Sequence, residues 1–143
     1  MRTHKAMRFD AQKEREMEKA ISDFSQPLMS NSKWIRLINK LVENADKILK
    51  IEFKKVQQDH IGELYLVMDT EYGFDYWQNG FEGCNSIGGW LLFKEVEYLV
   101  FPKTASNKYG EHYLEQIEAL LESVGQFSIE KDENRLKLLC YKK

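Results

Sequence analysis

Apolar residues recur at helical spacing in three stretches of the chain, residues 9–24, 31–48 and 108–124. The second stretch follows residues 30–32, whose Ser and Asn side chains favour the N-cap position, and its wide apolar stripe predicts a core-facing helix. The first stretch has a narrow stripe and a highly charged remainder, while the third ends at Gly125, a residue favoured just after a helix. The stripe of the second helix consists of Trp34, Leu37, Ile38, Leu41, Val42, Ala45 and Ile48.

Alternation of apolar and polar residues predicts strands between these helices. Residues 50–56 and 63–69 are joined by a polar turn, which is typical of an antiparallel hairpin. Residues 126–131 and 135–142 flank another polar turn and predict a second hairpin. Between the hairpins, residues 90–102 predict one long strand or two short ones.

The order of these elements predicts an α+β fold, with a mostly antiparallel sheet and helices packed on one face. The helix at 31–48 with its hairpin is similar in order to the helix at 108–124 with its hairpin, which also suggests two αββ units. We expect residues 1–29 to form an N-terminal helical arm and residues 30–143 to form a single α+β domain.

Composition indicates an ordinary globular protein and argues against several functions. Of 143 residues, 43% are hydrophobic and 31% are charged, and the net charge of −2 gives no basic footprint for nucleic acid. No apolar run approaches the roughly 18 residues that a membrane span needs, so we expect no membrane partner. The basic N-terminus lacks the apolar stretch of a secretory signal, and two distant cysteines form no disulfide framework. These features favour a cytoplasmic location.

Residues 71–90 combine many aromatic residues with five glycines. Glycines at this density are typical of a loop, and the aromatics indicate that this loop folds down to cap the core. Between Met68 and Leu92 the chain has acidic residues but no Lys or Arg, so this stretch would repel a phosphate backbone. We expect Tyr72, Tyr76 and Trp77 to stay exposed and to contribute to a protein-binding surface.

The third predicted helix carries a stripe of glutamates opposite its apolar face. The four residues repeat at i, i+4, i+7 and i+11 with no lysine between them, and such like charges destabilise a helix. A solvated face accounts for this pattern, and a basic protein partner would offset the repulsion and speed encounter. We expect Ser106 or Asn107 to cap this helix. The stripe consists of Glu111, Glu115, Glu118 and Glu122.

Cys84 is a candidate thiol nucleophile within the glycine-rich stretch. A catalytic thiol needs a base within hydrogen-bond reach, which His60 or His112 would have to supply. No cysteine-enzyme signature surrounds Cys84, so a small buried hydrophobic residue is the simpler interpretation, and Cys140 is expected in the core. The histidines and cysteines lack paired metal-ligand spacing, so we predict neither a metal site nor a cofactor.

Glu95 and Glu97 form a candidate carboxylate pair. Side chains at i and i+2 of a strand project to the same side, about 7 Å apart, and two carboxylates at this separation can perform acid–base chemistry. With His60, they would define a small hydrolase or other enzyme with its cleft beside the aromatic loop at 69–90. A solvent-facing strand is the non-catalytic interpretation, and Lys94 fits it.

Three short motifs resemble a family of small bacterial proteins of unknown function. They are S-N-S-K-W-I-R-L from residue 30, G-G-W ending at residue 90, and K-E-V-E-Y-L-V-F-P ending at residue 102. The resemblance covers residues 30–102. It implies a bacterial cytosolic single domain and provides no catalytic residue.

The sequence therefore favours a non-enzymatic bacterial module that binds an unidentified, basic protein partner. Small acidic α+β domains are similar in character to immunity proteins that neutralise bacterial toxins, although likeness of fold class does not establish function. The alternative is the carboxylate enzyme described above. A third interpretation is a homodimer built through an edge strand or through the aromatic segment.

Overall fold

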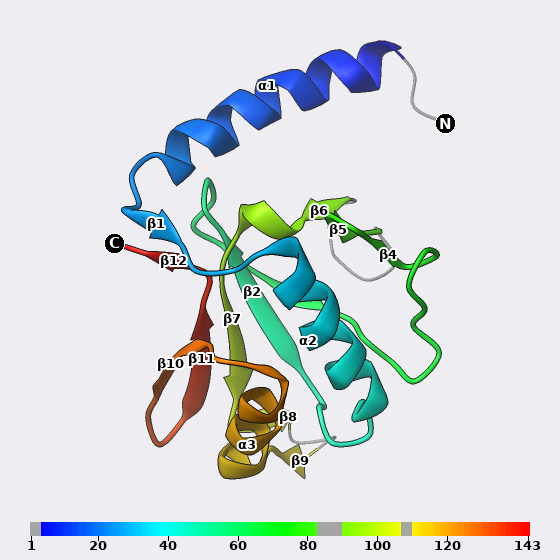
Figure 1. Ribbon diagram of the computed structural model, residues 1–143, viewed down its shortest axis with the longest axis vertical. Coiled ribbons are helices and arrows are strands. Elements are labelled where there is room, and N and C mark those ends of the chain that lie inside the picture. The colour runs from blue at the N-terminus through cyan, green and yellow to red at the C-terminus, as the bar shows by residue number, and fades with distance from the viewer. Residues whose placement is uncertain (1–3, 83–89, 107–109) are drawn as a thin grey trace.

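The computed structural model describes residues 4–82, 90–106 and 110–143, and it has an α+β fold (Figure 1). Two helices lie on one face of an antiparallel sheet, and a third extends across one end of the molecule (Figure 1). The predicted fold class is thus confirmed. The helices are α1 (His4–Ile21), α2 (Asn31–Glu43) and α3 (Leu114–Val124).

The main sheet has the strand order β10-β11-β7-β2-β3, and every neighbouring pair is antiparallel. Both predicted hairpins are present, as β2–β3 and β10–β11, although β3 pairs only up to Leu64 and not through residue 69. The strands are β2 (Ile51–Lys55), β3 (Ile61–Leu64), β7 (Val96–Pro102), β10 (Ser128–Lys131) and β11 (Arg135–Leu139).

The two helix–hairpin units have the predicted order of elements but are not copies of one another. In the first unit, the first strand of the hairpin, β2, lies beside the central strand β7. In the second unit, it is the second strand, β11, that lies beside β7. The units therefore share an order along the chain and differ in how they join the sheet.

The core lies between the sheet and helices α2 and α3. Phe53, Leu99 and Leu138 are cross-strand neighbours on β2, β7 and β11, and all three are buried. The Ser30 hydroxyl accepts a hydrogen bond from the Lys33 N–H at 3.1 Å and so caps α2, as its sequence predicts. The helix ends at Glu43, earlier than the predicted residue 48. The side chains of α2 that face the core are Trp34, Leu37, Ile38 and Leu41.

Residues 90–102 form two short strands separated by a 3₁₀ turn. Strand β6 pairs with β5 in a small sheet of order β4-β5-β6, and Phe93 of the turn stacks on Trp34 with ring centroids 5.1 Å apart. Phe81 meets the same Phe93 ring edge-on at 5.2 Å. The rings of Phe81 and Phe93 therefore cap the core at the start of α2. The elements are β4 (Tyr76–Trp77), β5 (Gly80–Phe81), β6 (Leu91–Leu92) and the turn η2 (Phe93–Glu95).

A hairpin occupies the position at which α3 was expected to begin. Strands β8 (Thr104–Ser106) and β9 (Gly110–Glu111) pair with each other, and α3 starts only at Leu114. Ser106 therefore lies in a strand and does not cap the helix, while Asn107 is outside the described residues. The N-cap position is held by Tyr113, whose side chain makes no capping hydrogen bond.

The N-terminal segment is attached to the domain at two places. Strand β1 (Gln26–Pro27) pairs with β12 (Tyr141–Lys142), and Lys94 of η2 lies 2.9 Å from the Glu18 carboxylate of α1. The boundary at residue 29 stays a prediction. Among the described residues, no helix combines the length and the apolar character of a membrane span.

Candidate functional site

Exposed apolar side chains are concentrated in one part of the chain. Nine large hydrophobic side chains are exposed among the described residues, and seven of them lie in residues 61–77, which we call the apolar segment. It runs from β3 to β4 and forms the green loop beside α2 in Figure 1. Exposed apolar side chains that lie together are typical of a recognition surface, whereas single scattered ones are normal. The seven are Ile61, Tyr65, Val67, Met68, Tyr72, Phe74 and Trp77.

Internal hydrogen bonds hold the exposed loop in one conformation. The Val67 N–H donates to the Thr70 hydroxyl at 3.0 Å, and the Thr70 N–H donates back to the Val67 carbonyl at 2.9 Å. Gly73 has a φ of 91°, in the left-handed region that favours glycine, and its N–H donates to the Tyr76 carbonyl at 2.7 Å. The loop therefore presents its apolar side chains from a preformed backbone, which lowers the entropic cost of binding.

Tyr76 anchors the segment to the domain and does not belong to its surface. Its side chain is 1% exposed, and its hydroxyl donates a hydrogen bond to the Asn39 side-chain oxygen on α2. Burial raises the pKa of Tyr76, and the neighbouring Tyr72 raises it further. The expectation that Tyr76 stays exposed is therefore wrong. Tyr72 and Trp77 are exposed as predicted, and the Trp77 indole donates to the Glu82 carboxylate at 3.2 Å.

The charged residues of the apolar segment itself are all acidic. Residues 56–93 contain no Lys or Arg, a longer stretch than the interval from Met68 to Leu92 that the sequence pattern had suggested. Glu63 is neutralised by Lys50, whose Nζ lies 3.5 Å from it. The apolar side chains are thus set in an acidic surround. The acidic residues of this stretch are Asp59, Glu63, Asp69, Glu71, Asp75 and Glu82.

The predicted stripe of four glutamates on α3 is broken in two ways. Glu111 lies on β9 and not on the helix, so the continuous four-residue stripe is wrong. Glu115, Glu118 and Glu122 do lie on α3, but Lys131 of β10 reaches Glu118 at 2.9 Å. The pKa of Lys131 is raised by its hydrogen bond to Glu118 and by the charges of Glu115 and Glu122. A lysine from another element therefore supplies the positive charge that the helix itself lacks.

The two candidate carboxylates have separate partners. Glu95 belongs to η2 and is 8% exposed; its carboxylate accepts from the Leu92 N–H at 2.7 Å and from the Gln57 amide at 2.9 Å. Glu97 lies on β7, and its carboxylate is 2.7 Å from the Lys54 ammonium group. Because Glu95 is in a 3₁₀ turn, the two side chains do not have the i, i+2 relation of a strand.

Among the described residues, the remaining candidates for catalysis or metal binding are not brought together. His60 is exposed before β3, and no hydrogen bond within the described ranges joins it to Glu95 or Glu97. Cys140 is buried in the core, where burial raises its pKa, and Cys84 lies outside the described residues. In the same ranges, no three His, Cys, Asp or Glu side chains are grouped so as to hold a metal ion.

Sequence reasoning missed part of the apolar segment. The alternation of residues 63–69 predicts a strand that includes Tyr65, Val67 and Met68, but the strand stops at Leu64 and the following residues leave the sheet. The signal that was available is the absence of positive charge, which begins at residue 56.

No family model, curated protein or solved structure matches this chain. A function therefore has to be inferred from the geometry of the chain itself.

Proposed function

We propose that this protein is a non-enzymatic module that binds another protein through the apolar segment. The observation that carries the proposal is the grouping of exposed hydrophobic side chains in residues 61–77. Aromatic residues and Met are enriched in protein interfaces, and this surface offers Tyr, Trp, Phe and Met side chains on a preformed loop. Leaving them in water would have a free-energy cost that burial by a partner removes.

The acidic charge of the apolar segment favours a basic protein as the partner. Asp69 and Glu71 lie within the apolar segment, and no Lys or Arg occurs in residues 56–93. A partner with Lys or Arg around an apolar centre complements this arrangement, and such complementarity increases the association rate. A basic toxin held by an immunity-type inhibitor in the bacterial cytoplasm would fit this description, and we include that role in the proposal.

The test compares variants at two equally exposed aromatic positions. Phe74 is 69% exposed inside the apolar segment, and Tyr113 is 73% exposed outside it. Wild type, Phe74→Ser and Tyr113→Ser are used to capture proteins from extracts of the source organism, and the affinity for any retained protein is then measured. We expect Phe74→Ser to weaken binding at least tenfold, with an unchanged unfolding midpoint, and Tyr113→Ser to bind as wild type does.

Several outcomes would contradict the proposal. Capture of no protein by the wild type, or equal weakening by both substitutions, would exclude the apolar segment as the specific binding surface. Sedimentation at two protein concentrations identifies a second copy of the chain as the occupant, since the mean mass would then rise with concentration and Phe74→Ser would abolish the rise. A captured protein without basic character would overturn the assignment of partner class.

A further inference from the structure

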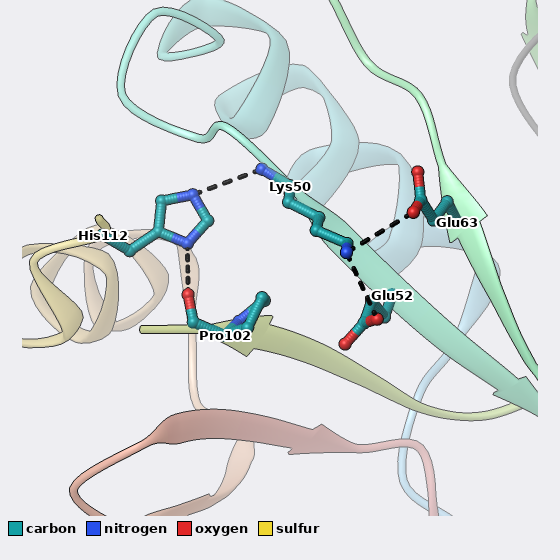
Figure 2. Close-up of polar contacts among 5 residues, drawn as sticks. All are labelled: Lys50, Glu52, Glu63, Pro102 and His112. Carbon is teal, nitrogen blue, oxygen red and sulfur yellow. Dashed lines mark hydrogen bonds and ion pairs between the residues drawn. The ribbon is translucent and has the colours of Figure 1, made fainter. Parts of the chain in front are cut away.

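His112 connects two parts of the fold through both nitrogens of its ring (Figure 2). Nε2 accepts a hydrogen bond from the Leu49 N–H at 2.6 Å, and the Lys50 N–H lies 3.3 Å from the same atom. Nδ1 lies 2.7 Å from the Pro102 carbonyl oxygen. A backbone N–H can only donate and a carbonyl can only accept, so Nδ1 carries the proton and Nε2 is bare. The arrangement requires the neutral ring in one tautomer.

Burial of the His112 ring also favours its neutral form. The His112 side chain is 4% exposed, and burial lowers its pKa, while the Pro102 carbonyl offsets part of the effect. The Lys50 side chain points away from the ring toward Glu52 and Glu63, whose carboxylates lie 3.7 and 3.5 Å from its Nζ (Figure 2). The ionisable residues on the segments around the ring are Asp46, Lys47, Lys50, Lys103, Glu111 and Glu115.

The His112–Leu49 bond also joins the two walls of a groove. A groove of about 680 Å³ lies between α2 and α3, with Ile117 and Ile48 among its lining residues. Leu49 belongs to one wall, while Glu111 and Tyr113, the chain neighbours of His112, belong to the other. The walls are therefore joined through a titratable side chain, in addition to the core packing of Ile48 and Ile117.

We propose that His112 is a proton-sensitive latch that holds the two walls of this groove together. A proton taken from solvent onto Nε2 replaces the acceptor of the Leu49 N–H with a second donor, and two donors facing each other repel. The connection at residues 44–50 then moves away from the ring, and the groove opens. The sheet stays folded, because its strands are joined by their own backbone hydrogen bonds. The latch is independent of the proposed partner surface.

Nuclear magnetic resonance of the wild-type chain between pH 7.5 and 5 tests the latch without a substitution. We expect the His112 ring to change from the Nδ1–H tautomer to the doubly protonated form below its ordinary midpoint of about 6.5. The Leu49 amide and the amides of groove residues such as Leu120 should shift with the same midpoint. The amide of Leu99, in the middle of β7, should not shift.

Two results would overturn the latch. These are protonation of His112 without a shift of the Leu49 amide, or a His112 ring that stays neutral until the whole chain unfolds. The variant His112→Gln keeps a polar side chain that does not titrate in this range, so its Leu49 amide should not change with pH, whereas His60→Gln should titrate as wild type does. If His112→Gln fails to fold, the wild-type titration still decides.

Discussion

At the scale of single residues, Glu95 shows how a carboxylate with catalytic potential is used for structure. It accepts hydrogen bonds from the Leu92 N–H and the Gln57 amide, and it is almost fully buried. We predict that Glu95→Ala lowers the free energy of unfolding by about 1–3 kcal/mol, because two donors lose their acceptor. Glu95→Gln keeps one amide oxygen for the Leu92 N–H and should lose less. Urea denaturation at pH 7.5 measures both values.

The control for Glu95 is an exposed glutamate of a helix. Glu122 lies on the solvent side of α3, and Glu122→Ala should change the free energy of unfolding by no more than about 0.5 kcal/mol. Equal losses for Glu95→Ala and Glu122→Ala would show that Glu95 has no structural role. The question of a catalytic role would then reopen for Glu95.

At the scale of elements, the small sheet β4-β5-β6 depends on a close approach at Gly80. A Cβ atom at Gly80 would lie 2.5 Å from the Leu91 carbonyl oxygen and 2.9 Å from the Trp90 ring. Backbone cannot yield as easily as a flexible side chain, so Gly80→Ala should lower the free energy of unfolding by about 1–3 kcal/mol. Gly125→Ala is the matched control, because nothing lies within 4 Å of its added Cβ and its φ of 171° is extended.

The outcome for the small sheet is measured by urea denaturation, together with the near-ultraviolet circular dichroism of the packed aromatic rings. Gly80→Ala should reduce both the unfolding midpoint and the aromatic signal, since Phe81 follows Gly80 in β5 and its ring packs against Phe93. A midpoint equal to that of Gly125→Ala would mean that β5 adjusts without cost and does not depend on glycine.

The elements that follow from local sequence were predicted well. The apolar stripe of α2 and its Ser30 cap depend on residues that are three or four positions apart in the sequence. Both hairpins follow from the alternation of apolar and polar residues around a polar turn. The β8–β9 hairpin was not predicted, because His112 is bonded to Lys103 through its backbone and to Leu49 across the fold. Such long-range contacts override the local preference of Ser106 for a helix cap.

At the scale of the whole molecule, the exposure of individual aromatic side chains is the property that the sequence predicts least well. Phe81 and Phe74 both lie in the aromatic stretch of residues 71–90. Phe81 is buried beneath α2, whereas Phe74 is exposed. Their local sequences do not distinguish them, since burial is decided by which strands pair and by where α2 lies. The absence of Lys and Arg from residues 56–93 is evident from the sequence alone, and these residues include the candidate site.

The whole fold should respond to pH through His112. Burial lowers the folded-state pKa of His112 below its ordinary value of about 6.5, so the unfolded chain binds more protons once the pH falls below that value. The stability that the neutral ring contributes is complete above about pH 6.5 and is lost as the pH falls through the folded-state pKa. The loss is bounded by the cost of an unpaired buried N–H, about 1–3 kcal/mol.

Urea denaturation between pH 7.5 and 5 separates this effect from that of the carboxylates. Asp132, whose pKa is lowered by hydrogen bonds from the Asn134 and Arg135 N–H groups, loses its contribution only below its ordinary value of about 3.9. We expect the free energy of unfolding of wild type and His60→Gln to fall together over this range, and that of His112→Gln to stay nearly constant from a lower starting value. A parallel fall in all three proteins would assign the acid sensitivity to another group, because the glutamine at position 112 cannot take up the proton.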